Sequence, residues 1–308
     1  MFAENAKHFR WTAFLIFILG FGVLFAGCGS EESDDIPSGP AEQVESLIEE
    51  GWVAFNDGMI DEALGYFTDA ANSEASNLEA YLGMGYSFSE NNELDRAHQS
   101  FGNVIALSAV LLSAGEVTQE EVDVLLAETY AGKAAAYLAG GDFAEAVSSG
   151  DMAIALWTAM SDPGHRWIDG FDLTMLKLIV ANSHYNGNDY NEAMMIVDEL
   201  SGNFIANAVH VFSATETLNP TLLETTWQTG IAQLDLVDHE YLIHPTSVVD
   251  GAGLDCVIQT FDMAGDMVEF LANPVPDAND LYTVDYYYSD DFGEFLIELR
   301  NKISELEG

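Results

Sequence analysis

The sequence predicts an all-α protein, built as a solenoid of antiparallel helix pairs with degenerate C-terminal helices. Three observations predict this fold. Small and aromatic residues recur thirty-four positions apart from residue 51 onward. Short turn sequences such as Asp57-Gly58 separate the two halves of each period. No alternation of polar and apolar residues typical of a strand extends over a useful length of the sequence.

The charge balance excludes two classes of partner. The 308 residues include 52 acidic and 8 basic ones, for a formal net charge of −44. So few cations cannot form the basic face of a nucleic-acid-binding protein or a polybasic contact with anionic lipid. With 49% hydrophobic residues, the chain can still bury a core. Two hypotheses explain the acidity: adaptation to high salt, which screens carboxylate repulsion, or a low-pI surface without special meaning.

Residues 1–27 have the pattern of a secretory signal. Lys7 and Arg10 precede the apolar run Trp11–Ala26, which is shorter than the ~20 residues that a membrane span needs. The run ends in Phe25-Ala26-Gly27-Cys28, which resembles a bacterial lipobox. The resemblance implies cleavage before Cys28 and lipidation of Cys28, palmitate included. An uncleaved anchor helix is the alternative.

The same resemblance implies a place in the cell envelope. In this family an Asp after the lipidated cysteine commonly signals inner-membrane retention, and here Gly29 follows Cys28. The implied location is therefore the outer membrane, facing the periplasm. Residues 28–41 are acidic and rich in Gly, Pro and Ser, which predicts a flexible tether to the folded part.

Residues 42–205 carry the repeats. Gly51, Ala63 and Phe67 recur thirty-four residues later, and two further copies follow at spacings of 49 and 47. The residues expected to pack the helices together are Gly51, Ala63, Phe67, Gly85, Ala97, Phe101, Ala134, Ala146, Ala181 and Ala193. This pattern resembles the tetratricopeptide repeat (TPR), a pair of antiparallel helices. In such a pair small residues let the helices approach closely, and the aromatic residue fills the space between repeats.

The wider spacings predict longer helices or insertions. Residues 109–120 are one insertion, with a break at Ser113-Ala114-Gly115 and a helix start at Thr118. The other contains a stop at Ser161-Asp-Pro-Gly164, followed by His165-Arg166-Trp167. Trp167 is either a lid over a helix pair or part of a binding edge. Gly150 stands where the third copy would have its packing aromatic.

Residues 206–308 are predicted to form degenerate helical pairs that cap the array. Helical periodicity predicts three helices, at Pro220–Leu236, Leu254–Leu271 and Asp291–Leu306. The stretch Val275–Asp291 is expected to be irregular. Its tyrosines either pack onto the last helix or form a recognition surface; they are Tyr282, Tyr286, Tyr287 and Tyr288.

A search for catalytic motifs favours a protein that is not an enzyme and holds no cofactor or metal. The sequence has no glycine-rich phosphate loop, HExxH, CxxC or GxSxG. Cys256 lies in an apolar run, as a buried structural cysteine would. The best metal candidate matches no known ligand spacing and is more typical of a solvated helix end; it consists of Asp235, Asp238, His239, Glu240 and His244.

A repeat array of this kind implies a concave groove that binds a protein partner. The expected groove residues, from the inner helix of each pair, are Asn56, Tyr86, Glu90 and Tyr137. An acidic groove favours a basic or neutral partner segment. The alternative function is a solute-handling lipoprotein, resembling the helical-repeat accessory component of TRAP transporters. It would enclose a small ligand in an aromatic-lined cavity.

Overall fold

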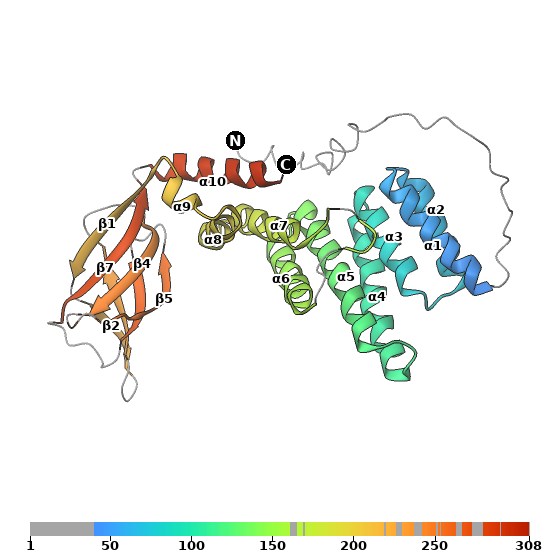
Figure 1. Cartoon of the computed structure of the whole chain (residues 1–308), viewed down its shortest axis with the longest axis horizontal. Helices are drawn as coiled ribbons and strands as arrows, with labels where there is room; N and C mark the ends of the chain where they lie inside the picture. Colours follow the sequence, from blue (N-terminus) through green and yellow to red (C-terminus); the bar gives the residue numbers. More distant parts are fainter. Residues whose placement is uncertain are drawn as a thin grey trace. The chain divides into compact units, whose positions relative to one another are not determined.

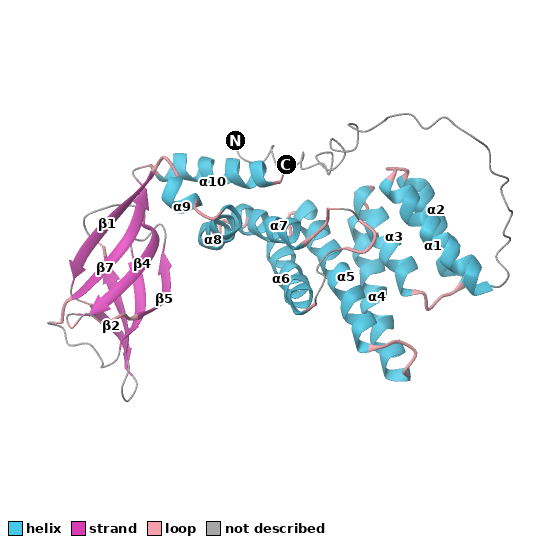
Figure 2. Cartoon of the chain, viewed as in Figure 1, coloured by secondary structure: helices cyan, strands magenta, loops and turns pink. Residues whose placement is uncertain are grey.

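The chain divides into two units at residue 188. The computed structural model describes residues 40–160, 165–168, 170–218, 220–225, 230–236, 242–250, 252, 254–262, 267–272, 280–289 and 291–307. The first unit, up to Gly187, is helical, and the second, Asn188–Leu306, contains the strands (Figures 1 and 2). The expected signal peptide and lipidation site, and all but the end of the tether, lie outside the described residues. Of the helices described, none has the length and apolarity to cross a bilayer.

The first unit is a TPR-like solenoid of helix pairs. Its helices are α1 (Pro40–Asn56), α2 (Ile60–Ser73), α3 (Leu78–Glu90), α4 (Leu94–Ala114), α5 (Gln119–Gly140), α6 (Phe143–Ala159) and α7 (Leu173–Asn186). Helices α1 and α2, α3 and α4, and α5 and α6 pack as antiparallel pairs (Figure 1). Each pair turns on one residue with positive φ, namely Gly58, Asn92 and Gly141. Glycine and asparagine adopt this backbone conformation most readily, so the turn chemistry recurs with the repeat.

Aromatic side chains of the second helices wedge between first helices of successive pairs. Phe67 and Phe101 are fully buried. A methyl group on Gly51 would lie 2.6 Å from the Phe67 ring, and one on Gly85 would lie 2.5 Å from the Phe101 ring. Gly83 and Gly132, each on the first helix of the next pair, are as close to the same two rings. Glycine is required here because any side chain would displace the wedge.

The small residues at the equivalent positions are all buried. No side chain of Ala63, Ala97, Ala134 or Ala146 is exposed to solvent, and the same is true of Ala181 and Ala193. At the third pair Gly150 replaces the aromatic wedge, and Val180 of α7 packs directly against it. The apolar volume missing from α6 is therefore supplied by the neighbouring helix.

The first insertion is explained by longer helices. Helix α4 continues to Ala114 and ends at Gly115, which has a φ of 73°. Helix α5 then begins after Thr118, whose side chain accepts from the backbone N–H of Glu121 in a capping box. The predicted helix start at Thr118 is confirmed. The predicted stop at 161–164 lies outside the described residues, although α6 does end just before it, at Ala159.

The second unit combines three helices with two antiparallel sheets. Its elements are α8 (Tyr190–Ser201), α9 (Phe204–Asn207), β1 (Val211–Leu218), β2 (Thr221–Thr225), β3 (Gly230–Asp235), β4 (Leu242–Asp250), β5 (Val257–Asp262), β6 (Met267–Ala272), β7 (Tyr282–Ser289) and α10 (Phe292–Leu306). The strand orders are β1-β7-β4 and β2-β3-β6-β5. One apolar cluster, including Leu234, Val268 and Val284, draws on both sheets.

The prediction of C-terminal helices is therefore wrong except for α10. Residues 220–236 form β2 and β3, and residues 254–271 include β5 and β6. The expected irregular stretch contains β7, along which Tyr282, Val284 and Tyr286 are buried in alternation. The apolar spacing of these short segments fits either period, and pairing with distant strands decides between them. The expected boundary of the repeats at 205 also differs, because α8 groups with the second unit.

We expect the fold to be stabilised strongly by salt, because 52 acidic residues face only 8 basic ones. At about 1 M salt the screening length falls to about 3 Å, which removes most carboxylate repulsion. Raising NaCl from about 10 mM to about 1 M should raise the thermal midpoint by about 5 °C or more. KCl should have the same effect, since screening depends on ionic strength. A midpoint that is flat in both salts would contradict the hypothesis of adaptation to brine.

Candidate functional site

The candidate site is the inner face of the solenoid, formed by the first helices of three successive pairs. Helices α1, α3 and α5 contact one another in that order. Trp52 on α1 and Tyr86 on α3 are thirty-four residues apart, so the repeat places them on the same face. We define the inner face by Trp52, Asn56, Glu79, Tyr86 and Glu128. All five come from the solenoid itself.

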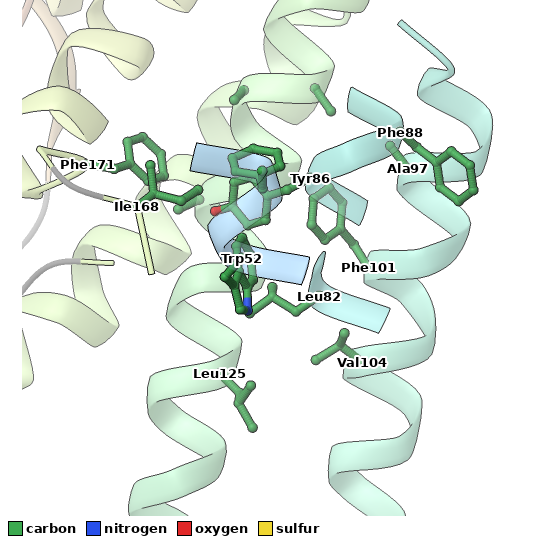
Figure 3. Close-up of a cluster of buried hydrophobic side chains, with 14 of the residues drawn as sticks. Trp52, Leu82, Tyr86, Phe88, Ala97, Phe101, Val104, Leu125, Ile168 and Phe171 are labelled. Atoms are coloured by element: carbon green, nitrogen blue, oxygen red, sulfur yellow. The ribbon is translucent and has the colours of Figure 1, made fainter. Parts of the chain in front are cut away.

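Aromatic rings form the floor of the inner face (Figure 3). The ring centroids of Trp52 and Tyr86 are 6.0 Å apart, and Tyr86 lies 5.4 Å from Phe101 in an edge-on contact. The Tyr86 hydroxyl donates to the backbone carbonyl of Glu128 at 2.8 Å, which joins α3 to α5. Burial, followed by the charge of Glu128, raises the pKa of Tyr86 well above its usual value. The hydroxyl therefore stays protonated and remains a donor.

The segment between α6 and α7 covers this floor. We call residues 165–171 the α6–α7 segment; residue 169 within it is not described. The indole of Trp167 stacks on Trp52 with a centroid distance of 6.0 Å and an angle of 5°. His165 lies 4.9 Å from Tyr86, and Phe171 lies 6.5 Å from the same ring. Figure 3 shows Ile168 and Phe171 reaching toward Tyr86 from this segment.

Polar contacts fix the α6–α7 segment at both the main chain and a side chain. The Asn56 amide donates to the carbonyl oxygen of Trp167 at 2.9 Å. Glu128 accepts three hydrogen bonds from Arg166: from its backbone N–H at 2.8 Å, from Nε at 3.0 Å and from Nη2 at 2.8 Å. Glu79 accepts a fourth, from Nη1, at 2.7 Å. Two carboxylates thus hold one guanidinium.

Burial and neighbouring charges shift the pKa values of Arg166 and His165. Burial alone lowers the pKa of Arg166, but its hydrogen bonds with Glu128 and the charges of Glu128 and Glu79 outweigh burial and raise it. Burial and, to a lesser extent, Arg166 lower the pKa of His165 to about 3. Its Nδ1 accepts from the backbone N–H groups of Trp167 and Ile168. His165 is therefore neutral, and its 3.9 Å approach to Glu128 is not an ion pair.

The structure brings two of the four expected groove residues together. Asn56 and Tyr86 belong to the inner face, with Tyr86 buried beneath the α6–α7 segment rather than open to a partner. Glu90 occupies the position of α3 that corresponds to Asn56 in the repeat, and it is half-buried. Tyr137 lies elsewhere, stacked at 3.9 Å on His98 of α4.

Sequence reasoning missed the ionic part of the site. It did not single out Glu79 or Glu128, and it noted Arg166 only within the triplet that includes Trp167. One signal was present. The residues one helical turn before and after Glu128, such as Leu125 and Ala131, are apolar, and a carboxylate on such a helix face needs a cation. Trp167 was expected to be a lid or a binding edge, and it lies as a cover over Trp52.

Glu90→Gln is expected to stabilise the solenoid above neutral pH. Burial raises the pKa of Glu90 to about 7, so the folded protein holds this proton more tightly than the unfolded chain. The carboxyl therefore destabilises the fold progressively as the pH rises from about 4.5 to 7. At pH 8 the substitution should add on the order of 2 kcal/mol to the free energy of unfolding. Urea melts of both proteins at pH 5 and pH 8 measure the difference.

The matched control for this prediction is Glu49→Gln, at an exposed position of α1. It should change the free energy of unfolding by less than about 0.5 kcal/mol at either pH. If Glu90→Gln and Glu49→Gln behave alike at pH 8, Glu90 is solvated and the prediction is wrong.

The remaining candidates are not brought together into a site. Cys256 is a free, half-buried thiol packed against the β cluster, and burial raises its pKa. Of the metal candidates, Asp235 ends β3 and His244 lies on β4, so these two are not at a helix end, and residues 238–240 are not described. Within the described ranges no group of three or more His, Cys, Asp or Glu residues is placed to hold a metal.

No protein family matches the sequence, and no curated protein matches it. Among solved structures, the Arabidopsis OM64 TPR domain is 17% identical, with a TM-score of 0.33 over 40% of this chain and 89% of that one. BtubC (BKLC) from P. vanneervenii is 15% identical, with a TM-score of 0.43 over 66% of this chain and 73% of that one.

The APC/C hetero-tetramer Cut9-Hcn1 is a third similar structure. It is 14% identical, with a TM-score of 0.29 over 53% of this chain and 34% of that one. These similarities are too low to indicate a function. The TPR-like character of the first unit rests on its own helix pairs, turns and aromatic wedges.

Proposed function

We propose that the chain is a non-catalytic, protein-binding scaffold of the bacterial cell envelope, anchored by lipid at Cys28. One observation supports the binding role above the others. The inner face binds the α6–α7 segment, which is not part of its own helices, through the main-chain carbonyl of Trp167 and the side chain of Arg166. A surface with these contacts is suited to a partner's polypeptide.

The same observation favours a scaffold over a solute-handling lipoprotein. A small-ligand protein would enclose its ligand in an aromatic-lined cavity. Here the rings of Trp52 and Tyr86 contact Trp167 and His165 directly. The aromatic surface is therefore used to pack against polypeptide.

The anchoring half of the proposal rests on the lipobox-like sequence. The proposed location is the outer membrane, facing the periplasm, because Gly29 and not Asp follows Cys28; residues 28–41 are the proposed tether. Expressed in a bacterium with labelled palmitate, the full chain should incorporate label and sediment with membranes, and Cys28→Ser should incorporate no label. Cys256→Ser is the matched control and should behave as the wild type. Label retained by Cys28→Ser, or absent from the wild type, would show the anchor to be wrong.

The binding half is tested by site-specific photocrosslinking in native membranes. A photoreactive amino acid at exposed Asn56 should give crosslinks to another protein. The same group at Val110, which is 60% exposed on α4, is the control and should give none. Recovery of an uncrosslinked monomer from both positions would contradict the scaffold.

A further inference from the structure

We propose that the inner face is a recognition site for an arginine followed by an aromatic residue, and that the α6–α7 segment is its built-in competitor. A partner would insert its own arginine–aromatic pair and displace Arg166 and Trp167. This inference rests on the proposed role in protein binding and names the chemistry of the partner segment.

The arginine half of the site follows from the geometry of two carboxylates. The side chain of Glu128 is fully buried, and that of Glu79 is 28% exposed. Together they take Nε, Nη2 and Nη1 of a single guanidinium. A planar guanidinium can serve both acids at once, whereas a lysine ammonium is a point charge without this fork. The site therefore selects arginine over lysine.

The aromatic half follows from Trp52 and Asn56. Trp52 stacks in parallel on the ring of Trp167, the residue that follows Arg166. Asn56 donates to the carbonyl oxygen of Trp167. The hydrogen bond to the carbonyl involves only the partner's main chain, so any residue at that position can accept it. The stacking surface supplies the preference for a flat side chain.

The fit of the α6–α7 segment is incomplete. The indole Nε1 of Trp52 is buried on a residue that is only 1% exposed, and it has no hydrogen-bond partner among the described residues. The Nε2 of His165 and the Nε1 of Trp167 are also buried without a hydrogen-bond partner among the described residues. Unpaired buried donors weaken the hold of the segment. A partner that supplies an acceptor to Trp52 would bind this face better than the segment does.

The ends of the segment are fixed by local hydrogen bonds that do not involve the inner face. The segment is a loop closed on itself by the backbone bond from His165 N–H to the carbonyl of Phe171. Helix α7 has its own cap, because the Asp172 side chain accepts from Met175 N–H at 3.0 Å. The side chain of Arg166 is 38% exposed, so its ion pairs with Glu79 and Glu128 are accessible from solvent. A tethered competitor of this kind acts at an effective concentration in the millimolar range and masks the site.

The test uses a fluorescent nine-residue peptide with the sequence of residues 164–172, GHRWIDGFD, added to the full chain. Binding is followed by anisotropy. In Trp167→Ala the internal competitor is weakened, so the peptide should bind at least about tenfold more tightly than to the wild type. A peptide with lysine in place of the arginine should bind this variant at least about tenfold more weakly.

A second variant, Ile168→Ala, guards against a folding defect in Trp167→Ala. It shortens a buried side chain of the α6–α7 segment, leaves the residues of the inner face unchanged and should also unmask the site. Circular dichroism checks that each variant is folded. Equal binding of the arginine and lysine peptides, or no peptide binding to either folded variant at about 1 mM, would overturn the inference.

The two experiments can contradict the recognition site and the proposed scaffold function separately. If a partner crosslinks at Asn56 and its crosslinked segment has no arginine beside an aromatic residue, the scaffold stands and this inference falls. If the peptide binds the unmasked variants selectively and Asn56 yields no envelope partner, the recognition site stands and the scaffold falls.

Discussion

Replacing Arg166 with alanine is expected to destabilise the solenoid by about 3 kcal/mol. The substitution leaves Glu128, whose side chain is fully buried, without its cation and without the two hydrogen bonds from the guanidinium; the bond from the backbone N–H of residue 166 remains. Breaking a buried pair by removing one partner costs about 3–5 kcal/mol. The lower end applies because the arginine side chain is 38% exposed. Urea denaturation followed by circular dichroism gives the change in the free energy of unfolding.

Arg96→Ala is the matched control for this prediction. Arg96 also pairs with a glutamate, Glu93 at 2.6 Å, but its side chain is 57% exposed. An exposed pair contributes about 0–1 kcal/mol, so this loss should be small. Combining Arg166→Ala with Glu128→Gln should recover part of the stability, since no buried charge then remains unpaired. Equal losses for Arg166→Ala and Arg96→Ala would show that Glu128 is solvated.

Replacing Phe101 with alanine is expected to cost about 3–5 kcal/mol. Its ring is fully buried between α3 and α5, where Gly85 and Gly132 leave room for it. Gly85 and Gly132 have no side chains that could fill the space left by the ring. The ring also supports Tyr86 at 5.4 Å, so the floor of the inner face should loosen as well. Thermal and urea melts measure the first effect, and the unmasking of peptide binding measures the second.

The control lies on the same helix. Val110 is 60% exposed on α4, and Val110→Ala should change stability by less than about 0.5 kcal/mol. Gly85→Val tests the same packing from α3, because the β-carbon of the valine would lie 2.5 Å from the Phe101 ring. Overpacking of this kind costs about 1–3 kcal/mol or more. If Phe101→Ala is no worse than Val110→Ala, Phe101 is not the wedge between repeats.

The helix pairs were predictable because each is specified within a short stretch of chain. Gly51, Ala63 and Phe67 lie within seventeen positions and encode one close-packed pair. The left-handed turn residue, Gly58 or Asn92, lies between the helices that it joins. The capping box runs over four residues, from Thr118 to Glu121. Local signals of this kind are independent of the rest of the fold.

The strands of the second unit were not predictable in the same way. Residues 230–235 pair with residues 267–272, so the choice of strand depends on a segment more than thirty residues away. In β7 the buried residues Tyr282, Val284 and Tyr286 alternate with less buried ones, but the stretch was predicted to be irregular because it is rich in Asp and Tyr. Packing against the opposite sheet outweighs such local preference.

The sequence by itself determined the repeat, its turns and the residues that let its helices approach, because those requirements recur every thirty-four positions. It also placed Trp52 and Tyr86 on one face. Only the tertiary structure decided what covers that face. Arg166 meets Glu128 across 38 residues and Glu79 across 87, and no periodic pattern links such positions. Their pairing follows from burial, since a carboxylate enclosed in a helical core must be met by the cation that the fold brings to it.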